Sequence, residues 1–170
     1  MIKQTMQHPS PIDWTSWSGE MHATILFIIK GGKILLIEKK RGLGAGKING
    51  PGGKIDVGET PLEAAVRETE EELCITPIAP RKLGELQFSM SDCPHIHCHV
   101  YRADDYVGTP TETDEAAPVW TDIDAIPYQR MWEDDQHWLP ILLENQSFLG
   151  RFVFDSDRLL WSEVTLDVSW

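Results

Sequence analysis

Clustered hydrophobic positions predict a β-hairpin early in the chain. Residues 23–29 and 33–37 are two apolar runs rich in Ile and Leu, and the Lys-Gly-Gly segment between them is typical of a turn. Residues 39–53 then contain six glycines and one proline. Because this composition disfavours both helix and strand, the sequence predicts a long loop there.

The clearest helix signal follows this loop. Thr60 suits the N-cap, Pro61 suits the first helical position, and Glu63 would complete a capping box. An apolar stripe with helical spacing is expected to pack inward; its members are Leu62, Ala65, Val66, Thr69 and Leu73. The sequence therefore predicts an amphipathic helix that begins at Pro61.

The rest of the chain predicts more strands and a second helix. Strands are expected at residues 81–90, 95–101, 118–123, 148–154 and 159–168, and a helix is expected at residues 138–145. In residues 95–101 apolar positions alternate with histidines, so Cys98 is expected to point into the core. Residues 1–20 lack periodicity, but Trp14 and Trp17 are costly to leave in water. We expect an arm that packs on the domain through these tryptophans; a segment that docks a partner is the alternative.

The amino-acid composition is typical of a globular protein, and a chain of 170 residues is expected to form one domain. Hydrophobic residues make up 41%, and no apolar run approaches the ~18 residues of a membrane-spanning helix. The three cysteines lack C-x-x-C spacing and form an odd set, which favours reduced thiols in the cytoplasm. Residues 1–20 are too polar for a signal peptide.

The net charge of −12 is unevenly distributed. Residues 1–102 carry 12 acids and 12 bases, whereas residues 103–170 carry 15 acids and three bases. Within the neutral part, residues 30–54 hold seven bases and one acid. An acidic protein repels long nucleic acids, but this basic segment could hold a small polyanion.

Three acids of the predicted helix suggest a metal site. Glu68, Glu71 and Glu72 share one side of the helix, and like charges at this spacing destabilise a helix unless something compensates them. Carboxylate oxygens suit Mg²⁺ or Mn²⁺. A solvated acidic face is the alternative for these three residues taken by themselves.

The surrounding spacing favours the metal site. Gly53 is followed after five residues by Glu59 and after seven more by Arg67-Glu68, and Glu71-Glu72 comes after a further gap of two. This resembles the Nudix box, G-x5-E-x7-R-E-U-x-E-E-x-G-U, in which U is apolar. Two positions depart from it: Thr69 replaces an apolar residue, and Cys74 replaces a glycine, so the turn that ends the helix could be altered.

The resemblance extends from about residue 23 to about residue 168, and it is specific to the oxidised purine nucleoside triphosphatases of the Nudix superfamily. Residues 39–55, 107–120 and 126–143 carry it outside the box. It implies an α/β fold, an α/β/α sandwich around a mixed β-sheet, with residues 1–20 as an extension and 21–170 as a single Nudix domain. The implied partner is a small nucleotide, without a nucleic acid polymer or a membrane. We also expect a cytoplasmic monomer.

The same resemblance assigns roles to individual residues. It implies that the metal, Mg²⁺ or Mn²⁺, is held by Gly53, Glu68, Glu71, Glu72 and Glu115. The general base stays open between Glu72, Glu71 and Glu115, because these carboxylates would titrate as a coupled set. Glu115 could instead be an ordinary loop acid. Glu59 and Arg67 are expected to brace the box by a charge pair.

A second group of residues is expected to bind the base. The resemblance implies that this pocket is lined by Thr24, Lys39, Asn49, Phe88, Trp132, Asp134 and Asp135. Asn49 and the two aspartates would bind the purine edge, and Trp132 and Phe88 would flank its ring. For Phe88, plain core packing is an equal alternative. One of two adjacent buried acids could keep its proton near neutral pH.

These residues predict hydrolysis of oxidised purine deoxynucleoside triphosphates, such as 8-oxo-dGTP and 2-hydroxy-dATP, to monophosphate and pyrophosphate. The alternatives are a Nudix hydrolase for another substrate (an unmodified triphosphate, a dinucleoside polyphosphate or ADP-ribose) and a Nudix module that binds nucleotide without hydrolysis. Separately, Cys93, His95, His97 and His99 would share one face of a strand and could hold zinc. Because structural zinc usually draws ligands from two separate turns, histidines facing solvent or the pocket are favoured.

Overall fold

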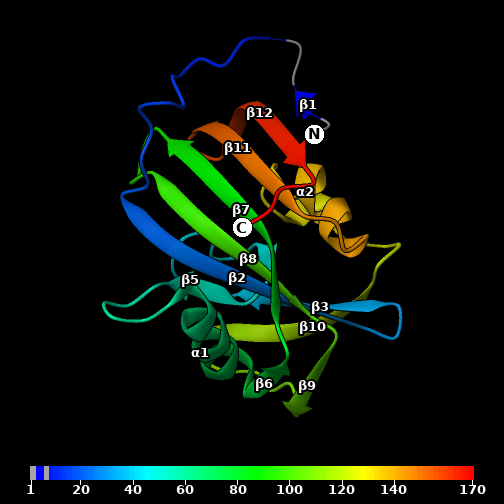
Figure 1. Ribbon diagram of the computed structural model, residues 1–170. Coiled ribbons are helices and arrows are strands. Elements are labelled where there is room, and N and C mark those ends of the chain that lie inside the picture. Colours follow the sequence, from blue (N-terminus) through cyan, green and yellow to red (C-terminus); the bar gives the residue numbers. More distant parts are fainter. Residues whose placement is uncertain (1–2, 6–7) are drawn as a thin grey trace.

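A computed structural model describes residues 3–5 and 8–170, and its main feature is one large sheet (Figure 1). In the described residues the sheet has ten strands, in the order β1 (Lys3–Thr5), β12 (Arg158–Leu166), β11 (Phe148–Asp155), β7 (Arg81–Met90), β8 (Ile96–Ala103), β2 (Met21–Lys30), β3 (Lys33–Lys39) and β10 (Ala116–Asp122), with β4 (Ile48–Asn49) paired to β3 and β5 (Gly52–Lys54) paired to β2. Outside it, β6 (Ile75–Ile78) pairs with β9 (Asp105–Gly108). The helices are α1 (Pro61–Leu73) and α2 (Asp135–Leu143), with a short 3₁₀ turn at Tyr128–Arg130.

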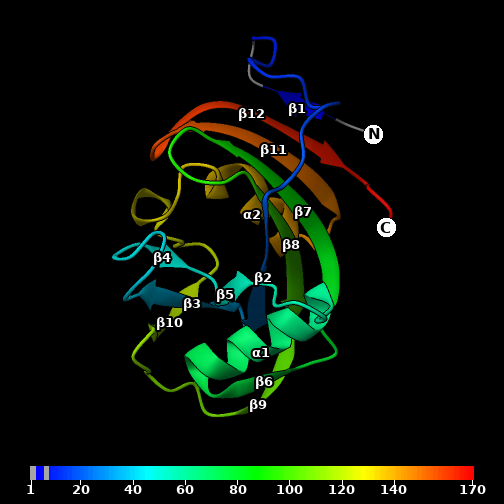
Figure 2. The same cartoon turned by 90° about the vertical axis from the view of Figure 1, so that its left-hand side faces the viewer.

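The sheet is mixed and curved. β2 runs parallel to β8, and β7 runs parallel to β11, while the other pairs are antiparallel. Figure 2 shows β12, β11, β7 and β8 arching around α2, whereas α1 lies on the opposite side with β6 and β9. The expected α/β/α sandwich is confirmed.

Alternation along the strands builds a hydrophobic core on each face of the sheet. On β2, Phe27 faces α2, whereas Leu26 and Ile28 face α1. The core on the α2 side is aromatic: the Trp138 ring stacks on Phe148 with their centroids 5.6 Å apart. Each helix thus covers one face of the sheet. In the described residues, no helix is long and apolar enough to cross a membrane.

The predicted start of α1 is confirmed. Thr60 caps the helix, and its side chain and that of Glu63 complete the capping box. Thr69 Oγ1 donates a hydrogen bond to the Ala65 carbonyl at 2.8 Å, which satisfies its buried hydroxyl. The placement of Leu62 in the packing stripe is wrong, because the buried residues of α1 begin at Ala64 and leave Leu62 41% exposed.

Other boundaries also differ from the sequence predictions. The glycine-rich stretch 39–53 is not loop throughout, because β4 and β5 pair with the edges of β3 and β2. The second helix begins at Asp135 rather than at residue 138, and it ends before Asn145, whose φ of 60° is left-handed. The sequence patterns missed β1, β6 and β9, which are strands of only three or four residues.

The N-terminal arm packs on the sheet through its tryptophans, as predicted. Trp14 stacks on Trp161 of β12 at 6.0 Å between ring centroids, and it also contacts Trp17 at 5.7 Å. Trp161 Nε1 donates a hydrogen bond to the His8 carbonyl at 2.9 Å. These contacts fix residues 8–17 to the face of the sheet that α2 does not cover.

The turn that ends α1 gives a test of backbone strain. Cys74 has a φ of 59° and a ψ of 30°, a left-handed conformation that costs a residue with a Cβ about 1–2 kcal/mol. Glycine offsets part of this gain, by about 0.5–1 kcal/mol, because it loses more conformational freedom on folding. Cys74→Gly should therefore raise the melting temperature by about 2–4 °C. Cys74→Ala, which removes the thiol but keeps the Cβ, should give no such gain. Equal melting temperatures of the two variants in calorimetry would contradict this explanation.

Candidate functional site

The site begins where α1 touches β5. A Cβ at Gly53 would lie 2.6 Å from the carboxyl carbon of Glu68, so a larger residue there would force the Glu68 carboxylate to move. The glycine of the box therefore leaves room for the carboxylate in its present position. It lets an acidic side chain of α1 lie directly against the strand that carries Gly53.

Arg67 holds the loop before the helix and the acids of the helix together. Its guanidinium binds the Glu59 carboxylate with two hydrogen bonds of 2.7 and 2.8 Å, and it donates to the Lys54 carbonyl at 3.1 Å. The same guanidinium lies 2.9 Å from a Glu68 oxygen. The hydrogen bonds from Arg67 lower the pKa of Glu59 to about 2. Arg67 thus acts as the expected brace, because it ties the loop before the helix to the helix itself.

Three carboxylates converge beside this brace. Oxygens of Glu68, Glu72 and Glu115 all lie within 4.8 Å of one another. Burial, and next the charge of Glu68, raise the pKa of Glu72 to about 8. Glu72 Oε2 is buried and has no hydrogen-bond partner in the described part of the chain. Three hard oxygen donors, one of them buried and unpartnered, fit a divalent cation such as Mg²⁺.

The other residues expected at the metal site lie at its edge. Glu71 is not brought into the group: its carboxylate is half-exposed and lies 3.2 Å from Arg67. Glu115 belongs to the group and also forms an ion pair of 2.7 Å with Arg41. Lys39 is close enough to favour the ionised form of Glu72. A basic side chain therefore lies between the carboxylates and the adjoining pocket.

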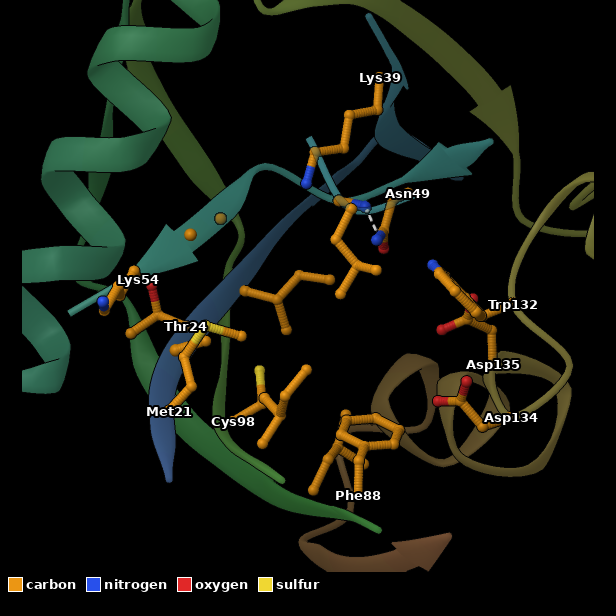
Figure 3. Close-up of a pocket in the computed structure, with 18 of the residues that line it drawn as sticks. Met21, Thr24, Lys39, Asn49, Lys54, Phe88, Cys98, Trp132, Asp134 and Asp135 are labelled. Carbon is orange, nitrogen blue, oxygen red and sulfur yellow. Dashed lines mark hydrogen bonds between the residues drawn. The ribbon is translucent and has the colours of Figure 1, made fainter. Parts of the chain in front are cut away.

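A pocket of about 280 Å³ adjoins the carboxylate group (Figure 3). It lies on the α2 face of the sheet, and its lining contains all seven residues predicted to bind the base: Thr24, Lys39, Asn49, Phe88, Trp132, Asp134 and Asp135. Gly53 lines it as well, so the pocket and the carboxylate group share one boundary. The pocket walls are otherwise mostly apolar, which suits a flat ring with a few polar edges.

Two buried acids lie at the far wall of this pocket. Trp138 Nε1 donates a hydrogen bond of 2.8 Å to Asp134 Oδ2, whereas Asp135 Oδ2 is buried without a partner among the described residues. Burial raises the pKa of Asp134, and burial together with the charge of Asp134 raises the pKa of Asp135 further. The pair can thus present both a proton donor and an acceptor to a ligand.

Aromatic and amide side chains complete the pocket. The Trp132 ring meets Phe154 edge-on, and Lys47 Nζ lies 5.0 Å from its centroid. Phe88 stacks on Phe152 and is partly buried, so it serves both the core and the pocket wall. Asn49 Oδ1 accepts a hydrogen bond from the Gly50 backbone, which leaves its amide NH₂ free to face the pocket, where Figure 3 shows it opposite Trp132.

Comparison with known proteins identifies the family. The NUDIX domain family matches residues 20–142. The chain belongs to the Nudix family. It is 45% identical over 138 residues to an oxidized purine nucleoside triphosphate hydrolase of Danio rerio, which covers 81% of this chain and 88% of that protein. A Mus musculus protein of the same name is 40% identical over 139 residues and covers 81% and 89%.

A solved structure agrees with this assignment. The mutator MutT protein from Bacillus halodurans aligns with a TM-score of 0.77 and 25% identity, and the alignment covers 86% of this chain and 97% of that one. The two departures from the Nudix box leave its architecture intact. Thr69 bonds within its helix, and Cys74 takes the left-handed turn without the usual glycine.

Two functional neighbours in this Nudix domain were missed by sequence reasoning. Trp138 is the hydrogen-bond donor to Asp134, and a spacing of four residues would have indicated the contact had the helix been predicted to begin near Asp134 rather than at residue 138. Lys47 covers the Trp132 ring from the glycine-rich loop. No spacing rule predicts that contact, because the loop reaches the ring only through the tertiary fold.

The buried acids give a prediction for pH. The pKa of Asp135 is higher in the folded than in the unfolded state, so the native protein binds more protons, and stability falls as pH rises through the folded pKa. Asp135→Asn should thus match the wild type in acid but melt about 2–6 °C higher at pH 8, because asparagine does not titrate and avoids the cost of keeping an acid buried at that pH.

The control for this measurement is Asp157→Asn, in the exposed turn between β11 and β12. It should not reproduce the gain in thermal stability at pH 8. A pH-independent difference between Asp135→Asn and the wild type would show that ionisation of Asp135 is not the cause.

Proposed function

We propose that this Nudix protein hydrolyses oxidised purine deoxynucleoside triphosphates to the monophosphate and pyrophosphate. Support comes from two relatives named oxidized purine nucleoside triphosphate hydrolase, which match four-fifths of the chain. The observation that carries the proposal is the shared boundary at Gly53. There, an apolar pocket with polar edges meets a group of converging carboxylates. A nucleotide could therefore place its base in the pocket and its phosphates at the carboxylates at the same time.

The proposed binding mode places the phosphates over α1. Glu68, Glu72 and Glu115 would hold Mg²⁺, with Mn²⁺ as a substitute, and the Gly53 carbonyl is a proposed further ligand. Glu71 as a ligand remains a prediction that requires its carboxylate to leave Arg67. When bound, the cation supplies charge neutralisation for the phosphates and lowers the pKa of an attacking water. Lys39 adds a positive charge on the pocket side.

The protein must also accept a proton from the attacking water. Glu72 is the most buried acid of the group. Burial raises its pKa, so it would accept the proton in the ionised form that a bound cation favours. Glu71 and Glu115 remain candidates, because interacting carboxylates titrate as a set. The brace formed by Glu59 and Arg67 is proposed to position these acids rather than to touch substrate.

The pocket is proposed to bind the modified purine by its edge. The Asn49 amide offers donors, and the Asp134–Asp135 pair offers a carboxyl that can carry a proton beside one that accepts. An adaptable pair of this kind can match the different edges of 8-oxo-dGTP and 2-hydroxy-dATP. Trp132 and Phe88 are proposed to flank the ring, with Thr24 and Lys39 at the end nearer the phosphates.

The cellular setting remains a prediction. We propose a monomer, because the site is built from one chain, and we propose residues 21–170 as the Nudix domain with residues 1–20 as an extension. A cytoplasmic location remains the expectation from the cysteines. None of these points affects the chemistry of the site.

Replacement of the most buried acid tests the mechanism. Glu72→Gln should lower kcat for pyrophosphate release from 8-oxo-dGTP by ~10²–10⁴-fold, because both a cation ligand and a proton acceptor are lost. Glu70→Gln is the matched control: Glu70 lies on the same helix but pairs with Thr76 outside the group. Near-normal turnover of Glu72→Gln with a native circular dichroism spectrum would refute the mechanism.

Replacement of pocket residues tests the substrate. kcat/KM is measured over 8-oxo-dGTP, 2-hydroxy-dATP, dGTP, dATP, ADP-ribose and a diadenosine polyphosphate. The wild type should favour the modified purines, and Asn49→Ala or Asp134→Ala should reduce that preference ~10–100-fold, the effect of one or two lost buried hydrogen bonds. If both variants keep the preference for modified purines, another diphosphate substrate is favoured.

A further inference from the structure

Three histidines gather on the face of the sheet opposite the pocket. Ile96 and Cys98 of β8 line the pocket, so the intervening His97 and the following His99 point to the other face. β2 runs parallel to β8 and pairs His22 with His97. One ring nitrogen from each of the three histidines lies within 4.8 Å of the others.

A partly buried carboxylate contacts two of these rings. Glu85 of β7 lies 2.9 Å from His97 Nε2 and 3.4 Å from His99 Nδ1. The His97 and His99 rings stack at 4.9 Å, and the His22 ring centroid lies 5.6 Å from that of His97. Three adjacent strands therefore contribute three imidazoles and one carboxylate to one small volume.

Within the described residues, His99 lacks a hydrogen bond at one ring nitrogen, although a Glu85 oxygen lies 3.4 Å from that nitrogen. Its Nδ1 is buried and makes no hydrogen bond to any residue that the structure describes. Burial, and next the charge of Lys82, lower the pKa of His99 to about 4. The neutral form of an imidazole is the one that binds metal ions. A buried nitrogen lone pair or N–H without a partner normally has an explanation of this kind.

We propose that His22, His97 and His99 bind one late first-row divalent cation, Zn²⁺ in particular, at a site separate from the carboxylates of α1. Three imidazoles suit Zn²⁺ and disfavour Mg²⁺, which prefers oxygen ligands. Glu85 lies outside this group of three but contacts two of its rings, so it could turn in as a fourth ligand. Three nitrogen donors and one carboxylate match a closed tetrahedral set for Zn²⁺.

The site would close by side-chain rotation. Zn–N bonds of ~2.0–2.1 Å place tetrahedral ligands about 3.3 Å apart, so the nitrogens must approach one another by at most about 1.5 Å. His22 is exposed, so the required rotation of its ring is not blocked by burial. Glu85 also pairs with Lys82, so a cation would compete with that lysine for the carboxylate. Binding would cross-link β2, β8 and β7.

The site would also lie beneath the N-terminal arm. Trp17 meets the His97 ring edge-on, with centroids 6.1 Å apart, and Gly19 packs against the His97 Cβ so closely that a side chain there would clash. A cation that fixes His97 would therefore order the surface on which the arm rests. Residues 8–20 would then rest on an ordered His97 in addition to the stacked tryptophans.

The ligand set differs from the one that the sequence suggests. His95 lies before β8, and its Nδ1 accepts a hydrogen bond of 3.2 Å from the Met90 backbone, so it is already engaged. Cys93 is not in the group of potential ligands either. His22, which is more than 70 residues away in sequence, takes their place because β2 pairs with β8.

The test is calorimetric titration of the full chain with Zn²⁺ in saturating Mg²⁺, which occupies the carboxylate site. The wild type should bind one Zn²⁺ per chain. His22→Gln and His97→Gln should each weaken binding by more than the ~10–100-fold that loss of an outer-shell partner costs. His95→Gln and the exposed His8→Gln are matched controls and should bind like the wild type. Bound Co²⁺ should give the intense visible absorption of a tetrahedral site.

Three results would overturn the proposal. One is the absence of Zn²⁺ binding to the wild type. Another is unchanged binding by both His22→Gln and His97→Gln. The third is Zn²⁺ binding that is lost in Glu68→Gln but kept in His22→Gln, which would assign the ion to the carboxylates of α1. Because the readout is binding, the outcome is independent of the proposed hydrolysis.

Discussion

The candidate site depends on the burial of like charges on one helix. Glu68 and Glu72 lie side by side, with Glu68 against the backbone of Gly53, and removal of such carboxylates from water raises their pKa values. Arg67 offsets part of this cost through its ion pairs with Glu68 and Glu59. What remains uncompensated is the unpartnered oxygen of Glu72, and this oxygen is the feature that best supports the proposed binding of a cation.

The sheet separates the chemistry of the molecule into distinct regions. One face, with α2, builds an apolar pocket whose only deeply buried acids are Asp134 and Asp135 among the described residues. The edge beside β5 carries the carboxylates of α1. The face of the sheet opposite the pocket carries the histidines, and the strands separate them from the pocket. Oxygen-rich and nitrogen-rich sites can thus coexist in a small domain, because side chains alternate between the two faces of a strand.

Sequence patterns correctly predicted the features that depend on interactions between residues close together in the chain. The capping box at Thr60 and Glu63, the hairpin of β2 and β3, and the inward direction of Cys98 follow from neighbouring residues, and all are confirmed. Leu62 was misplaced, because periodicity assigns a face to a residue but not the length of helix that the sheet covers. The strands within residues 39–53 were missed because their formation depends on pairing with β2 and β3, which overrides a glycine-rich composition.

The sequence by itself determined the family and the acids of the box, because fixed spacing along a helix carries both the geometry and the chemistry. It also indicated the residues that line the pocket through resemblance. Only the tertiary structure decided which acids converge: Glu115 joins Glu68 and Glu72, whereas Glu71 turns to Arg67. Likewise, strand pairing alone brought His22 to His97. Contacts between distant segments depend on the register of the sheet, which no local pattern encodes.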